Sequence, residues 1–118
     1  MTKLGSIVEF PQKRRKSWPE QVCFNRFELS EILNIYGLMV AAGLWRDYAI
    51  AMRPDRAVFA VFRRASEVPV YRIVKEPTRA RQQGAFLVLG RDGQIMKRGH
   101  SLPQVLRPFR AKLLKVVS

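Results

Sequence analysis

The pattern of apolar and polar positions predicts a helix over residues 26–42. Apolar residues recur there at helical spacing and define one stripe: Leu29, Ile32, Leu33, Tyr36, Val40 and Ala41. A stripe of this kind is typical of an amphipathic helix whose apolar side packs on a core. Leu33 lies on the stripe, so its side chain is expected to be buried.

Signals at both ends of this segment agree with the helix. Asn25 is a favourable N-cap residue, and Glu28 three positions later completes a capping box. Phe24 and Leu29 have the spacing of a hydrophobic staple. Gly43 supplies a residue that adopts the left-handed conformation in which helices commonly end.

After the helix the period changes to two, which predicts strands. In residues 46–52, Tyr48, Ile50 and Met52 share one face of the first strand. Further short apolar segments follow at 57–62, 70–75, 85–89 and 95–98. Pro54 favours a turn after the first strand. Asp92-Gly93 predicts a hairpin with a type I′ turn before the last strand.

The C-terminal part contains a second helical pattern. Ser101 and Gln104 resemble a capping box, and apolar residues follow at helical spacing: Leu102, Val105, Leu106 and Phe109. Pro108 is expected to end or kink this helix, and residues 110–118 are compatible with either a helix or a strand. The predicted fold is therefore α+β, with an N-terminal helix, an antiparallel meander of about five strands and a C-terminal helix.

The first 21 residues have a different character from the rest. Pro11 and Pro19 interrupt any helical period, and the segment holds a basic cluster of Lys13, Arg14, Arg15 and Lys16. The cluster fits a phosphate-binding arm or a solubilising extension equally well. We expect residues 1–21 to form a disordered basic tail and residues 22–118 to form a single domain.

No segment is long and apolar enough to predict membrane insertion. The longest apolar run, residues 37–45, has nine residues, whereas a spanning helix needs about 20. The first 22 residues lack the apolar core of a signal peptide. A cytoplasmic protein with no membrane span is therefore expected.

Net charge is the most informative property of the composition. The 118 residues include 22 Lys and Arg against nine Asp and Glu, a formal net charge of +13. Residues 77–118 carry nine basic residues and only Asp92 as an acidic one, a net +8. A field of this sign attracts polyanions: nucleic acid, an acidic protein surface or anionic lipid.

The residues that catalysis and metal binding need are scarce. The single histidine, His100, and the single cysteine, Cys23, stand 77 positions apart, and no carboxylate is closely spaced with His100. There is no nucleophile elbow, phosphate-binding loop or dinucleotide fingerprint. We predict no catalytic residue, no metal site and no cofactor, with His100 in a structural hydrogen bond and Cys23 a passive thiol.

Trp45-Arg46-Asp47-Tyr48, directly after the first helix, has two interpretations. In the first, Trp45 fills the junction between helix and sheet, and Asp47 pairs with an arginine on a neighbouring strand. In the second, the segment presents a polar and aromatic surface to a partner.

Residues 24–106 resemble a small family of alphaproteobacterial proteins classed as a domain of unknown function. The segments that carry the resemblance are Ile35-Tyr36-Gly37, Met39-Val40-Ala41-Ala42-Gly43, Trp45-Arg46-Asp47-Tyr48-Ala49-Ile50, Ala57-Val58-Phe59, Val61-Phe62-Arg63-Arg64, Tyr71-Arg72-Ile73 and Lys97-Arg98-Gly99-His100. The resemblance implies no activity, because none is known for the family.

The charge pattern favours a non-enzymatic protein that binds nucleic acid mainly through phosphate contacts. The candidate binding residues are Lys13, Arg14, Arg15, Lys16, Arg63, Arg64, Arg72, Arg79, Arg81, Lys97 and Arg98. Tyr71, Phe59 or Phe86 could stack on bases beside them, or could belong to the core. The alternative is an interaction module whose basic surface docks an acidic protein. An enzyme is the third hypothesis, and a homodimer through an exposed sheet edge is compatible with all three.

Overall fold

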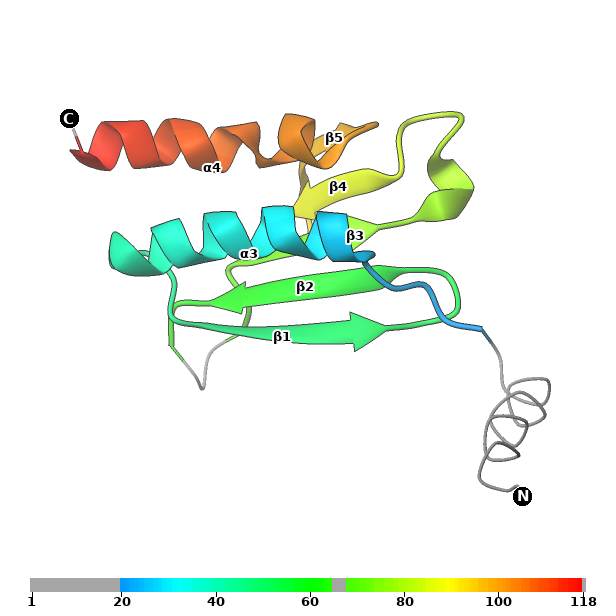
Figure 1. Cartoon of the computed structure of the whole chain (residues 1–118), viewed down its shortest axis with the longest axis horizontal. Coiled ribbons are helices and arrows are strands. Elements are labelled where there is room, and N and C mark those ends of the chain that lie inside the picture. Colours follow the sequence, from blue (N-terminus) through cyan, green and yellow to red (C-terminus); the bar gives the residue numbers. More distant parts are fainter. Residues whose placement is uncertain (1–19, 65–67, 118) are drawn as a thin grey trace, which may run out of the picture.

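Two helices cover one face of a five-stranded antiparallel sheet (Figure 1). The computed structural model describes residues 20–64 and 68–117. Its elements, in chain order, are α3 (Arg26–Ala41), β1 (Asp47–Met52), β2 (Ala57–Phe62), β3 (Tyr71–Lys75), the short 3₁₀ helix η1 (Pro77–Arg79), β4 (Phe86–Leu89), β5 (Ile95–Gly99) and α4 (Leu102–Val117). The predicted α+β class and element order are confirmed. All but two residues of the predicted tail, including Lys13, Arg14, Arg15 and Lys16, lie outside the described residues.

The N-terminus of α3 is capped as its sequence predicts. The backbone N–H of Glu28 donates to Asn25 Oδ1, and the backbone N–H of Asn25 donates to Glu28 Oε1, both at 2.8 Å. Lys75 of β3 adds an ion pair, since its Nζ lies 2.7 Å from Glu28 Oε1 and also donates to the Cys23 carbonyl. The capping box therefore ties the start of α3 to the sheet.

The face of α3 that is buried differs from the predicted stripe. Ile32, Ile35 and Met39 are fully buried, whereas Leu33 is 37% exposed and Val40 is also exposed. The prediction that Leu33 is buried is wrong. The helix packs against both the sheet and α4, and residues 32, 35 and 39 lie on the side that contacts both.

Each strand pairs with its neighbour in the sequence, so the sheet order is β1-β2-β3-β4-β5. On the face toward the helices, Phe59 of β2 lies opposite Ile50 of β1 and Ile73 of β3. Phe59 and Ile73 are fully buried and, with side chains of both helices, form the centre of the core. The prediction that residues 57–62 form a central strand agrees with this arrangement.

The hairpin predicted at Asp92-Gly93 is present, but its turn is not of type I′. Only Gly93 has a positive φ, of 87°, whereas a type I′ turn needs positive φ at both central residues. The Gly93 N–H donates to Gly90 O, and the Gly90 N–H donates to Gln94 O. This is a three-residue loop that ends in a left-handed glycine, and it accompanies a register shift at Val88/Leu89.

The helix α4 runs through Pro108 and extends to Val117, so of the two outcomes expected for Pro108, an end of the helix is wrong. A proline inside a helix costs about 3 kcal/mol. Leu106 and Phe109, on either side of Pro108, are both buried, and Pro108 itself is exposed. Burial of the apolar side of α4 thus offsets the lost backbone hydrogen bond.

In the described part of the chain, neither helix has the length and apolar character needed to span a membrane.

Replacing Asn25 with alanine is expected to lower the free energy of unfolding by about 1 kcal/mol, because the backbone N–H of Glu28 then loses the side-chain oxygen that accepts its hydrogen bond. Asn25→Asp keeps an acceptor at the same position and should retain most of the stability. Urea unfolding followed by circular dichroism measures both variants. Equal losses for the two would show that the capping hydrogen bond is not what stabilises this end of α3.

Candidate functional site

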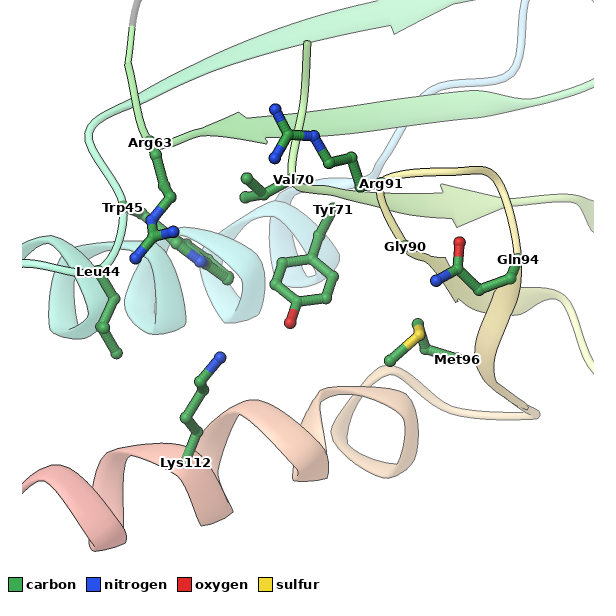
Figure 2. Close-up of a pocket in the computed structure, with 10 residues that line it drawn as sticks. All are labelled: Leu44, Trp45, Arg63, Val70, Tyr71, Gly90, Arg91, Gln94, Met96 and Lys112. Carbon is green, nitrogen blue, oxygen red and sulfur yellow. The ribbon is translucent and has the colours of Figure 1, made fainter. Parts of the chain in front are cut away.

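A pocket of about 290 Å³ lies between the end of α3, the end of β2, the β4–β5 hairpin and α4 (Figure 2). Its lining residues are Leu44, Trp45, Arg63, Val70, Tyr71, Gly90, Arg91, Gln94, Met96 and Lys112. They come from segments far apart in the sequence, and the sheet register and the packing of α4 bring them together. None of the described residues that line it is a carboxylate.

Aromatic packing fixes one side of this pocket. The rings of Trp45 and Phe109 meet edge to face with centroids 5.0 Å apart, and those of Tyr71 and Phe109 meet similarly at 4.9 Å. Trp45 is only 4% exposed. The interpretation that Trp45 fills the junction between helix and sheet is thus confirmed, and Tyr71 keeps a partly exposed surface toward the pocket.

Three cationic side chains come from three different elements to line the pocket. Arg63 follows β2, Arg91 belongs to the β4–β5 hairpin, and Lys112 lies on α4. Figure 2 shows the Lys112 side chain reaching toward Tyr71, and its Nζ lies 6.0 Å from the ring centroid, within the range of a cation–π contact. Among the described residues, none of the three cations has an ion-pair partner.

An adjoining hollow of about 320 Å³ extends the same basic region. Arg63 and Arg91 line it together with Arg64, Gly43 and Leu44. Four cationic residues thus surround the two hollows, and none of the described residues that line them is a carboxylate. The excess of basic side chains makes the potential there positive, which favours an anionic ligand.

The basic residues predicted as a binding site do not form one cluster. Arg63 and Arg64 line the region just described, whereas Arg72 lies on the sheet face away from the helices. There Arg72, with Arg53 and Arg56, lines a separate hollow of about 520 Å³.

The remaining candidates lie elsewhere. Arg79 and Arg81 are exposed in and after η1, at the opposite end of the sheet from the pocket (Figure 1). The Arg98 guanidinium donates to the Gly84 carbonyl and lies 3.5 Å from a Glu76 carboxylate oxygen. It therefore has a structural role. Lys97 is half-buried in β5.

Two of the three aromatic residues considered for base stacking belong to the core. Phe59 is fully buried and Phe86 nearly so, while Tyr71 lines the pocket. The sequence prediction did not include Arg91 and Lys112. Their only signal was the strong excess of basic residues after position 77, which does not say which of these residues converge.

The single histidine and cysteine stand outside this region. His100 is exposed, and its backbone N–H donates to Gln104 Oε1 at 3.2 Å. The backbone group that the Gln104 side chain binds is therefore that of His100, one residue before Ser101, which the sequence predicted as the capping residue. Cys23 is exposed with a free thiol. Across residues 20–64 and 68–117, no group of three His, Cys, Asp or Glu side chains is placed to hold a metal ion.

The fold and the pocket define a small basic α+β protein with a five-stranded meander under two helices. The chain belongs to a family described as a protein of unknown function (DUF2794), whose model matches residues 22–106. The match includes Arg63 and Arg91 and ends before Lys112. No curated protein and no solved structure matches the chain.

Proposed function

We propose that this protein binds nucleic acid without catalysing a reaction, and that the pocket of Arg63, Arg91 and Lys112 holds a backbone phosphate. The observation that carries the proposal is the convergence of these three cations, from three elements, on a pocket whose described lining residues include no carboxylate. A phosphate would supply negative charge to balance them.

The types of side chain suit this ligand. Guanidinium groups donate paired hydrogen bonds to phosphate oxygens, and a lysine ammonium adds a compact charge. Tyr71 offers an aromatic surface beside Lys112, on which a neighbouring base could stack. Contacts to phosphate position a nucleic acid but do not distinguish one base sequence from another.

The net charge of +13 supports the same proposal at longer range. It attracts a polyanion before contact and accelerates encounter, an effect that salt weakens. On the other sheet face, Arg53, Arg56 and Arg72 line a separate hollow together with Asp55, whose carboxylate lies 3.5 Å from Arg56 Nε.

Binding should therefore depend strongly on salt. Fluorescence anisotropy of labelled single-stranded and duplex oligonucleotides, titrated at several salt concentrations, should give a linear fall of log affinity with log salt. The slope is about −0.9 per neutralised phosphate on a duplex and about −0.7 on a single strand. At physiological salt the dissociation constant is expected at about 10⁻⁴ to 10⁻⁶ M.

The triple variant Arg63→Gln, Arg91→Gln, Lys112→Gln should weaken binding by at least about tenfold and flatten the slope. The matched control is Arg79→Gln, Arg81→Gln, Arg107→Gln, which removes three charges at exposed positions outside the pocket. Equal weakening by both variants would point to the overall charge and contradict a phosphate site in the pocket. Negligible affinity of the wild type for every oligonucleotide would favour an acidic protein partner.

A further inference from the structure

The edge strand β1 carries an exposed apolar row on the face toward the helices. Tyr48 is 45% exposed, Ile50 39% and Met52 49%. Figure 1 shows β1 at the edge of the sheet with α3 set over the strands further in. Isolated apolar residues on a surface are common, but three in a row on an edge strand are a recognised site of strand pairing.

The helix α3 extends this apolar surface. Tyr36 packs edge to face on Tyr48, with ring centroids 5.0 Å apart. Leu33 and Val40 lie three residues before and four residues after Tyr36, so they share its side of the helix. Both are exposed. The row on β1 and these helix residues therefore form one apolar surface along the edge.

No strand in the described ranges pairs with the outer edge of β1, so that edge presents backbone hydrogen-bonding groups. The Arg53 N–H donates to Arg56 O, in register with the β1–β2 ladder. Hydrogen bonding alternates along an antiparallel pair, so residues 47, 49 and 51 direct their backbone groups toward β2. The N–H and C=O groups of Tyr48, Ile50 and Met52 consequently point away from the sheet. The Arg53 carbonyl accepts from the Val22 N–H, so the segment before α3 lies against this end of β1.

The opposite edge is protected against such pairing. In β5, Lys97 stands at the centre of the strand and Arg98 follows it. A register shift interrupts the β4–β5 ladder, and α4 packs against β5. Central charges, irregular pairing and a covering helix are the devices that keep sheet edges from associating. Among the residues that the structure describes, none of these devices is found along β1.

We propose that β1 pairs with β1 of a second copy of this chain, antiparallel and about a two-fold axis at Ile50. In this register Ile50 lies opposite Ile50 of the second copy, and Tyr48 lies opposite Met52. The outward backbone groups of all three residues then pair across the axis. The two sheets become one continuous sheet, and the apolar surfaces of both copies meet on the helix side.

Charge complementarity selects this register. It places Asp47 opposite Arg53 of the second copy, on the face away from the helices. Within the described residues Asp47 has no ion-pair partner, so the pairing with a neighbouring strand's arginine that its sequence suggested is not made inside one chain. If the register is moved by two residues, Asp47 lies opposite Asp55 or opposite Ala51 of the second copy. Neither is a pair of opposite charges.

The experiment is sedimentation equilibrium of the full chain over a range of protein concentrations. The wild type is expected to be a dimer. Ile50→Lys places two ammonium groups together on the axis and should raise the dimer dissociation constant roughly 100-fold or more. The matched control, Ile95→Lys, makes the same change at a site 58% exposed on the other edge strand and should leave the dimer intact.

A charge exchange separates loss of the dimer from loss of folding. Asp47→Arg and Arg53→Asp should each weaken association, and the chain with both substitutions should recover it. Circular dichroism checks that every variant is folded. A folded wild type that stays monomeric at its highest soluble concentration overturns the proposal. So does a dimer that is lost with Ile95→Lys but kept with Ile50→Lys, or a double exchange that recovers nothing.

Discussion

Ile35→Ala is expected to lower the free energy of unfolding by about 2–5 kcal/mol, the range for removing a buried isoleucine, leucine or methionine side chain. Ile35 is fully buried where α3 meets both the sheet and α4. Its neighbours come from the sheet and from α4 as well as from α3, so they cannot all move to fill the space. Urea unfolding followed by circular dichroism gives the value.

Leu33→Ala, two positions earlier on the same helix, is the matched control. Its side chain is 37% exposed and outside the core, so alanine should cost less than about 1 kcal/mol. The pair tests which side of α3 is buried. A large loss at Leu33 with a small one at Ile35 would mean that the helix is rotated from the orientation described.

Gly84→Ala is expected to destabilise the protein by roughly 2–5 kcal/mol, because two costs add. Gly84 has φ of 100°, a conformation that residues with a side chain rarely adopt. A Cβ there would also overlap the backbone carbonyl of Gly99. That carbonyl belongs to β5, so relief would require the sheet itself to shift. Thermal melting is a sufficient measurement.

Gly93→Ala separates the two costs. Gly93 also has a positive φ, of 87°, but no atom lies within 4 Å of a Cβ built there. Its substitution should cost only the conformational part, about 1–2 kcal/mol. If the melting temperature falls equally for both variants, the close approach of Gly84 to Gly99 adds nothing to the cost of Gly84→Ala.

Local signals in the sequence were sufficient for α3 and the five strands, but not for η1 or for the C-terminal part of α4. The capping box of Asn25 and Glu28 depends on residues three apart, and alternation depends on neighbours, so both are visible without the fold. The buried side of α3 is decided by what packs on it. Leu33 and Met39 are both apolar, and the packing of α3 against the sheet and α4 makes Met39 a core residue and Leu33 a surface one.

The same distinction explains the outcome at the turn and at the last helix. Asp92-Gly93 is favourable in more than one hairpin, and the three-residue loop comes with the irregular β4–β5 register. Pro108 is a helix breaker by local chemistry, but Leu106 and Phe109 keep α4 continuous because their burial stabilises it. Both are cases in which tertiary packing outweighs a local preference.

The pocket was only partly predictable. Arg63 was a candidate because it ends an apolar strand, but Arg91 and Lys112 approach it through the hairpin and through α4. The sequence left the structure of residues 110–118 open, so it could not place Lys112. Conversely, Arg98 looked like a binding residue, yet its charge is engaged by Glu76. The number of charges is visible in a sequence, whereas their pairing depends on the fold.

The connectivity of the sheet sets an order in which the protein can be assembled during synthesis. Every strand pairs with the strand made just before it, so the meander can form from local contacts, which are fast to make. The core, in contrast, cannot be completed until the end of the domain has been synthesised. Leu102, Val105, Leu106 and Phe109 belong to it and are made after all five strands. Until α4 has left the ribosome, part of the apolar face of the sheet stays open to water, and that nascent intermediate is the stage at which a chaperone would be needed most.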